Sequence, residues 1–241
     1  MSDELIRQHD GHLTRLTLNR PNKANALSAT LVEALLDAVD YAHTDGTRLL
    51  VLEGAGNHFC AGFDFTGYQD HSEGDLALRF IRVETLLQAI HHASFETLVL
   101  AHGKIFGAGA DLVAACGTRV AAPGTTFRMP GLRFGVVLGT RRLAHRIGTD
   151  HARAILSASR LFGCDEALGI NFIAEIAEVA QWSAIVQREQ ADCESLSLAA
   201  ATALHRQTTP DTRADDMAAL ARSVAVPGLI KRIRIFRENN T

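Results

Sequence analysis

The feature that most constrains this chain is a glycine-rich stretch between two apolar segments. Residues 101–111 spell Ala-His-Gly-Lys-Ile-Phe-Gly-Ala-Gly-Ala-Asp, with Thr-Leu-Val-Leu before them and Leu-Val-Ala-Ala-Cys after them. This order predicts a strand, a glycine turn and a buried helix. The first N–H groups of such a helix lack intrahelical partners, and Gly107 and Gly109 let a ligand approach the backbone closely. Asp111 follows one turn later, where its carboxyl group can face the same ligand.

The same stretch also has a purely structural interpretation. Short glycine patterns recur by chance, so the glycines could serve only tight helix–strand packing, and Asp111 could serve only a helix N-terminus. A second glycine-containing loop, residues 54–65, weighs against that interpretation. If the two loops are adjacent, each can aim one backbone N–H at the same point, which makes a two-donor oxyanion hole.

Composition excludes several classes of protein. The 241 residues are 47% hydrophobic with a net charge of −3, which suits one large domain, or one with an appendage. No basic block indicates nucleic acid or an anionic membrane, and no apolar run approaches the roughly 18 residues that span a bilayer. The acidic N-terminus has no signal-peptide core, and the four cysteines form no Cys-x-x-Cys pair. We therefore expect a cytoplasmic protein with reduced thiols and no metal site.

Strands and helices are predicted to alternate along most of the chain. A hairpin turn is expected at Asp10-Gly11, and Ser28, or Thr30 with Glu33 in a capping box, is expected to begin the first helix. The predicted strands cover residues 12–19, 48–52, 97–100, 118–122, 125–129 and 172–175. The continuous apolar run at 48–52 predicts a strand that is buried on both faces. The predicted helices cover residues 31–42, 75–93, 112–116, 140–158 with a break at Gly148, 165–169, and 179–239 with breaks near 209–210 and 227–228.

This alternation predicts an α/β core whose site lies at strand ends. The composition shifts near residue 178 to an Ala-rich helical segment. We therefore predict a core with the site over residues 1–178 and a helical region over residues 179–241. Apolar stripes on residues 229–236 predict burial of that helix in an oligomer.

Four motifs, in order, resemble those of the enoyl-CoA hydratase/isomerase, or crotonase, superfamily. Leu-Asn-Arg-Pro at 18–21 with Asn-Ala-Leu-Ser at 25–28 resembles its first motif, and Phe-Cys-Ala-Gly-Phe-Asp-Phe at 59–65 resembles its Phe-x-Ala-Gly-x-Asp-Leu loop. His102-Gly103 with Gly-Ala-Gly at 107–109 resembles its Asn-Gly and triple-glycine segment, and Asp-Glu-Ala-Leu-Gly-Ile at 165–170 resembles the segment after its active site.

The resemblance implies a spiral of ββα turns, followed by C-terminal helices that pack trimers or dimers of trimers. It implies an acyl-CoA substrate, with coenzyme A present only as part of the substrate and no separate cofactor. The amides of Phe63 and Ala108 would hold the thioester oxygen, and Asp111 would occupy the place of the first catalytic glutamate. Positions implied to line the coenzyme A site are Lys23, Ala24, Ala26, Ala61, Gly62, Asp64, Phe65 and Gly107.

Departures from the family pattern matter for the reaction. Asp111 is one methylene shorter than the family's glutamate, so its reach falls back by roughly 1.5 Å. Gly131 stands where hydratases have their second glutamate, and the loop 135–139 holds no acid. Hydration needs two positioned acid–base groups to hold the water and move its proton, and this chain retains one of them. We therefore predict an isomerase-like enzyme that stabilises a thioester enolate.

Two further classes remain open. One is an acyl-CoA decarboxylase or thioester hydrolase that uses the same oxyanion site. A carboxylate on the acyl group would then be held by Arg128, Arg133, Arg141 and Arg142, whose alternative interpretation is as surface arginines. The other is a catalytically degenerate member that binds coenzyme A esters without turnover.

Overall fold

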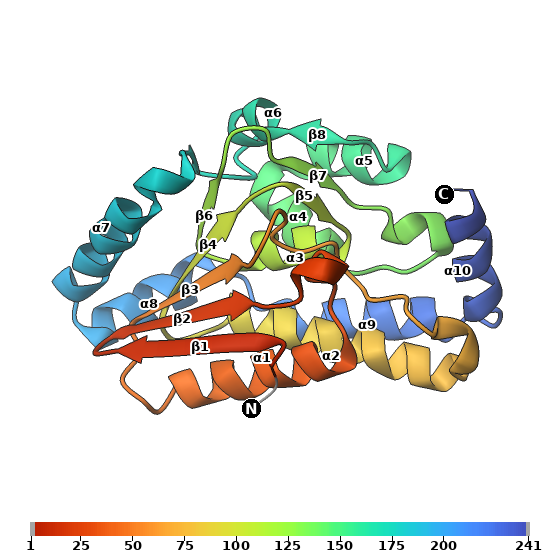
Figure 1. Ribbon diagram of the computed structural model, residues 1–241, viewed down its shortest axis with the longest axis horizontal. Helices are drawn as coiled ribbons and strands as arrows, with labels where there is room; N and C mark the ends of the chain where they lie inside the picture. Colours follow the sequence, from red (N-terminus) through yellow and green to blue (C-terminus); the bar gives the residue numbers. More distant parts are fainter. Residues whose placement is uncertain (1–2, 240–241) are drawn as a thin grey trace.

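The larger of two β-sheets runs through the centre of the protein (Figure 1). The computed structural model describes residues 3–239. The first two strands form the predicted antiparallel hairpin around Gly11, and all the other neighbouring pairs of this sheet are parallel. In spatial order the strands are β1 (Leu5–Asp10), β2 (Leu13–Leu18), β3 (Leu49–Gly54), β4 (Glu96–Ala101), β6 (Thr118–Ala121) and β9 (Glu175–Ile176).

Both faces of this sheet are buried. Leu50 and Leu52 of β3 face the main core, whereas Leu49 and Val51 belong to a second core on the opposite face. Helix α7 (Trp182–Ser195) covers that second face and lies across the sheet from the helices below it in Figure 1. The continuous apolar run of β3 therefore confirms the prediction of a strand buried on two sides.

Two long helices pack beneath the main core. Helix α1 (Ala29–Ala42) begins at Ser28, whose hydroxyl accepts a hydrogen bond from the Leu31 N–H. The alternative capping box of Thr30 and Glu33 is wrong, because Thr30 lies inside the helix and Glu33 pairs with an arginine of the next helix. That helix, α2 (Glu73–His91), begins with a capping box of its own between Ser72 and Asp75.

The glycine-rich stretch contains one element that the sequence did not predict. Between β4 and the predicted helix α3 (Ala108–Ala115), residues Lys104–Phe106 form strand β5. It belongs to a second sheet with β7 (Thr126–Arg128) and β8 (Phe162–Gly163). The strand expected at 172–175 pairs only from Glu175 onward, because Phe172 instead packs its ring against Phe127 and Phe162.

The remaining helices close the molecule. The predicted pair is α4 (Thr140–Ile147) and α5 (Thr149–Ala158), and α6 (Cys164–Gly169) follows. Short 3-10 turns are η1 (Pro21–Lys23), η2 (Tyr68–Asp70), η3 (Gly131–Phe134) and η4 (Val179–Gln181). The C-terminal helices after α7 are α8 (Leu198–Thr208), α9 (Arg213–Val224) and α10 (Leu229–Glu238), with an unpredicted break at residues 196–197.

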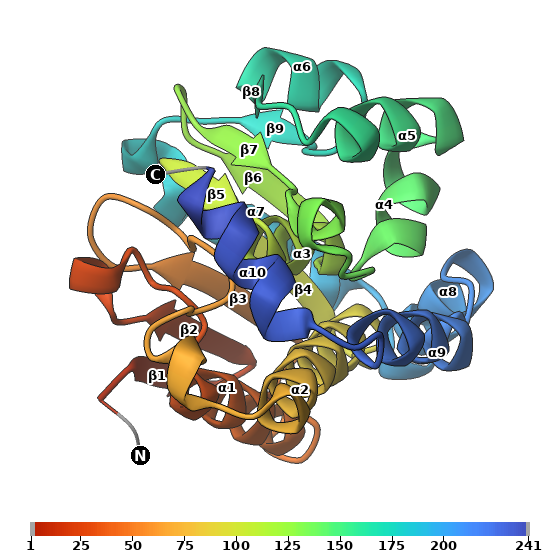
Figure 2. The ribbon, with the colours of Figure 1, turned by 90° about the vertical axis from the view of Figure 1, so that its right-hand side faces the viewer.

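Helix α10 folds back over its own chain (Figure 2). Leu229 and Ile233 are fully buried in the main core, so these two residues need no partner subunit to cover them, whereas Ile235 is exposed. The boundary expected at residue 178 stays a prediction, since helices on both sides of it share the same core. Within residues 3–239, no helix is both long and apolar enough to cross a membrane.

Candidate active site

A cavity of about 300 Å³ lies between α3, η3, the loop after β3 and helix α10. Both predicted glycine loops reach it, and most of its wall is aromatic or aliphatic. The predicted site residues that line it are Ala61, Phe63, Phe65, Gly107, Ala108 and Asp111. Residues of the wall that the sequence did not single out include Phe80, Met129, Phe134, Leu138, Thr140 and Phe236.

The two loops are in backbone contact. A Cβ atom built on Gly62 would stand 2.3 Å from the carbonyl oxygen of Phe106 and 3.2 Å from the amide nitrogen of Ala108. A Cβ atom on Gly109 would stand 2.2 Å from the carbonyl oxygen of Cys60. Only glycine fits at both positions, so these two glycines let the loops approach closely enough to share one site.

The amides of Phe63 and Ala108 are both free within residues 3–239. Phe63 forms an isolated parallel β-bridge with Leu27. The Leu27 N–H donates to the Gly62 carbonyl, and the Leu27 carbonyl accepts from the Asp64 N–H. The N–H of Phe63 therefore faces away from Leu27. Ala108 is the first residue of α3, so its N–H has no intrahelical acceptor.

Asp111 lies one turn into α3 and lines the same cavity. It is only 3% exposed, and its Oδ1 atom has no hydrogen-bond partner in the described part of the chain. Burial raises the pKa of Asp111 well above its usual range, although the positive charge of Arg142 opposes that rise and the negative charge of Glu84 adds to it. The carboxyl group of Asp111 therefore keeps its proton up to a higher pH than the carboxyl group of an exposed aspartate does.

No second carboxyl group lines this cavity within residues 3–239. Gly131, at the place of the second family glutamate, forms part of the wall at the start of η3. Nor does that part of the chain hold a cluster of three metal-ligating side chains. Asp111 is therefore the one acid that could move a proton within the cavity.

The four arginines that the sequence suggested as carboxylate-binding residues lie in different environments. Arg128 lines the cavity and donates from Nε to the carbonyl oxygen of Ser159. Arg133 donates to a backbone carbonyl of α5, and Arg141 pairs with Asp216. Arg142 is buried rather than on the surface, and forms an ion pair with Glu84. A cation that the sequence did not indicate, Arg237 of α10, joins Arg128 in the wall.

The residues expected to hold coenzyme A are divided between the cavity and its supports. Lys23 is exposed on η1. Ala24 contacts the loop of residues 54–65, because its carbonyl accepts the N–H of Ala61, and Ala26 lies two residues further on. The carboxylate of Asp64 contacts residues of its own chain next to the loop. It accepts a hydrogen bond from the Thr66 N–H and forms an ion pair with Arg20 at 3.0 Å. Burial alone would raise the pKa of Asp64, but these hydrogen bonds and the Arg20 charge lower it overall.

A second, more polar hollow of about 430 Å³ adjoins the cavity and shares Phe65 and Arg237 with it. Loop residues 65–69 form one side and the end of α10 forms the other, where Arg234 and Arg237 supply positive charge and Glu238 a negative charge. The apolar spacing of Leu229, Ile233 and Phe236 signalled that this helix would be buried. The sequence could not show that it would be buried over its own site.

Comparison with known proteins identifies the family of this chain. A family model described as enoyl-CoA hydratase/isomerase matches residues 8–224. The protein has the mixed α/β core of this class of enzymes. The chain belongs to the enoyl-CoA hydratase/isomerase family. The predicted crotonase fold class is thereby confirmed.

Individual relatives differ in name. A Mycobacterium leprae protein named "Probable enoyl-CoA hydratase echA6" is 34% identical over 191 residues, 75% of each chain. An ethylmalonyl-CoA decarboxylase of Mus musculus is 30% identical over 196 residues, 78% of this chain and 60% of the mouse protein. A crystal structure of a "putative enoyl-CoA hydratase/isomerase" from Bordetella parapertussis has a TM-score of 0.96 at 49% identity, and the match covers 98% of both chains.

Proposed function

We propose that this protein processes an acyl-CoA thioester through an enolate held by two backbone amides. The thioester oxygen accepts the N–H groups of Phe63 and Ala108, which are unpaired and come from loops in direct contact. Fixed donors of this kind stabilise the negative charge that develops on the oxygen, and removal of one typically costs about 10²- to 10³-fold in rate. The aromatic wall takes the acyl chain, and the adjoining hollow with its two arginines takes a phosphate-bearing part of coenzyme A.

Double-bond isomerisation is the reaction that the site supports best. The observation that carries this proposal is that Asp111 is the sole carboxyl group in the cavity wall of the described chain. In its ionised form Asp111 takes a proton from C2 of a 3-enoyl thioester, which gives a dienolate, and returns that proton to C4. One group performs both transfers, whereas hydration also needs a group that holds and activates water.

Decarboxylation is the second candidate, and it would use the same enolate. It is favoured by the 30% identity to the mouse ethylmalonyl-CoA decarboxylase and by the burial that raises the pKa of Asp111. In that reaction the electrons of the breaking C–C bond form the enolate as carbon dioxide leaves, and Asp111 donates its proton to C2. Arg128 and Arg237 could bind the carboxylate of the substrate before this step.

The dependence of rate on pH separates the two candidates. Isomerisation needs the Asp111 carboxylate, so its rate should rise as the pH passes through the raised pKa of this group. Decarboxylation needs the protonated acid, so its rate should fall over the same interval. The two reactions thus predict opposite slopes for one residue.

The test is a mass-spectrometric screen of acyl-CoA esters with the wild-type protein and with Asp111→Asn. We expect a double-bond shift or loss of carbon dioxide with the wild type, and loss of turnover by at least about 10²-fold in the variant with little change in ester affinity. Undiminished turnover in Asp111→Asn would remove this residue from the mechanism. Binding without turnover in the wild type would support the degenerate member instead.

We further propose that the protein assembles as a trimer or a dimer of trimers. The C-terminal helices and their connections leave large apolar side chains exposed on this chain. These side chains are Leu196, Leu198, Leu204, Val226 and Ile235. An oligomer interface would cover such exposed apolar side chains, and sedimentation as a stable monomer would contradict the assembly.

A further inference from the structure

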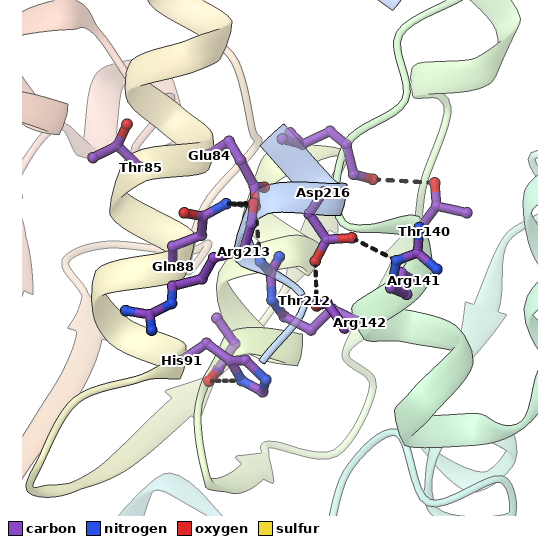
Figure 3. Close-up of polar contacts among 12 residues, drawn as sticks. Glu84, Thr85, Gln88, His91, Thr140, Arg141, Arg142, Thr212, Arg213 and Asp216 are labelled. Carbon is purple, nitrogen blue, oxygen red and sulfur yellow. Dashed lines mark hydrogen bonds and ion pairs between the residues drawn. The ribbon is translucent and has the colours of Figure 1, made fainter. Parts of the chain in front are cut away.

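A buried ion pair lies behind the helix that carries Asp111. Glu84 of α2 and Arg142 of α4 are 1% and 4% exposed, and Nη2 of Arg142 donates to Oε1 of Glu84 at 2.9 Å. Gln88, one turn after Glu84, donates to the same oxygen at 2.9 Å. Figure 3 shows Glu84 and Gln88 projecting from α2 toward Arg142. The pair therefore joins α2 to α4, the two helices that both pack against the fully buried helix α3.

The pair is incompletely satisfied. Within the described residues, Nε and Nη1 of Arg142 and Oε2 of Glu84 are buried and have no hydrogen-bond partner. Such groups are rare in native proteins and costly, and a buried ion pair seldom adds net stability over apolar packing. Stability alone therefore gives a poor reason for charges at this position.

Asp111 lies close enough to the Glu84–Arg142 ion pair to interact with its charges. Its Oδ1 atom is buried against Gly139, the residue that begins α4, and Arg142 lies in the first turn of that helix. Oδ1 itself has no partner in residues 3–239, so no hydrogen bond competes with the field of nearby charges. In a medium of low polarity, unit charges a few ångströms apart interact strongly.

We propose that the Glu84–Arg142 pair sets the protonation of Asp111, with both members acting as positioning residues that do not touch the substrate. The Arg142 cation favours the Asp111 carboxylate and the Glu84 anion favours the neutral acid. Burial raises the pH at which Asp111 changes from proton donor to proton acceptor, and the balance between the two charges adjusts that pH. This inference rests on the proposed role of Asp111, and it adds the residues that control that role.

Other charged groups near α3 contribute less. His91 of α2 is neutral at ordinary pH, because burial and then the charges of Arg142 and Arg146 lower its pKa to about 3. Arg146 of α4 donates to the Ala114 and Cys116 carbonyls at the far end of α3. Arg128 lines the same cavity as Asp111 and donates from Nε to the carbonyl oxygen of Ser159.

The test is a substrate-free titration of the Asp111 carboxyl group by infrared difference spectroscopy, with the band assigned by its loss in Asp111→Asn. In Glu84→Gln the midpoint should fall by roughly one pH unit, and in Arg142→Gln it should rise by a similar amount. Opposite shifts are the signature of charge, since general damage to packing would not move the midpoint in two directions. Unchanged midpoints, or shifts in one direction, would overturn the proposal.

Two controls complete the design. Glu84→Asp keeps the charge and should leave the midpoint near that of the wild type, as should Asp216→Asn, which breaks the neighbouring ion pair of α9 with Arg141 (Figure 3). If the two charge-removing variants fail to fold, Gln88→Lys replaces them, since it places a cation beside Glu84 at a half-buried position. This variant should lower the titration midpoint of Asp111. An unchanged midpoint in Gln88→Lys would also overturn the proposal.

The titration is independent of the reaction. If no acyl-CoA ester is turned over but the midpoints shift oppositely, the proposed function fails and the control of Asp111 by this pair stands. Where turnover is found, the pH midpoint of kcat should follow the spectroscopic midpoint in each variant while KM changes little.

Discussion

Gly139 lies directly against the carboxyl group of Asp111. A Cβ atom built at Gly139 would stand 2.0 Å from Oδ1 of Asp111, and Gly139 has φ +61, in the left-handed region that favours glycine. Gly139 ends the loop that lacks an acid of its own and begins α4. This loop therefore contributes to the site by closing behind Asp111, which fixes how far its short side chain extends into the cavity.

Replacement of Gly139 by alanine should displace the Asp111 carboxyl group. A shift of about 1 Å in a reacting group can cost on the order of 10²-fold in rate, so we expect kcat to fall by at least tenfold with ester affinity largely kept. The matched control is Gly148→Ala, since Gly148 has φ +80 but nothing within 4 Å of its Cβ position. Both variants should lose about 1–2 kcal/mol from backbone strain, measured by urea unfolding. Equal kcat in the two variants would contradict the role of Gly139.

The buried acid should make stability depend on pH in a definite direction. Because the pKa of Asp111 is raised on folding, its stabilising contribution is fully present below the unfolded pKa and is lost as the pH rises through the folded pKa. Asp111→Asn cannot ionise, so its free energy of unfolding should gain on the wild type by about 1.4 kcal/mol per pH unit over that window. Urea unfolding of both proteins across the window measures the difference. A constant difference would show that Asp111 is not perturbed.

The contact between the two glycine loops can be tested at neighbouring positions. Gly109→Ala places a methyl group 2.2 Å from the Cys60 carbonyl oxygen, so it should separate the loops and reduce kcat by about 10²-fold or more. Ala108→Gly keeps the N–H group and removes only a methyl from the cavity wall, so kcat should change by less than about tenfold. Steady-state kinetics of the two variants decides the matter. A larger loss in Ala108→Gly than in Gly109→Ala would contradict the role of the backbone amide.

Restoring the second carboxylate should favour hydration. Gly131 lines the cavity, and its Cβ position has one close neighbour, the Val136 carbonyl oxygen at 3.1 Å, so a small loop adjustment admits a side chain. Gly131→Glu should raise the rate of crotonyl-CoA hydration by at least about tenfold, since a second group can then hold water. Gly131→Gln has the same size without the charge and serves as the control. Fast hydration by the wild type would show that the missing glutamate is not needed.

Much of the fold followed from local patterns. The alternating strands and helices, the hairpin at Gly11, the break at Gly148 and the doubly buried β3 were all predicted from periodicity and turn residues. Strands β5 and β8 were missed because each is only two or three residues long, too short for a pattern to register. Their pairing with β7 comes from contacts distant in sequence.

The site was predicted in part. The motifs indicated Phe63, Ala108 and Asp111, and the structure places all three around one cavity. Asp64 was expected to face coenzyme A, yet its carboxylate is paired with Arg20, which no local pattern announces. Arg142 was considered as a surface or substrate-binding residue, and it is instead buried in an ion pair with Glu84.

The sequence by itself determined the family, the two glycine loops and the loss of the second glutamate, because glycine spacing and residue identity are local properties. Only the tertiary structure decided that α10 covers the cavity of its own chain, that Gly139 closes behind Asp111, and that a buried ion pair lies behind α3. These contacts join residues that are tens of positions apart in the sequence. The packing of whole helices sets which side chains are buried and which charges lie close together, and the order of residues along one helix does not.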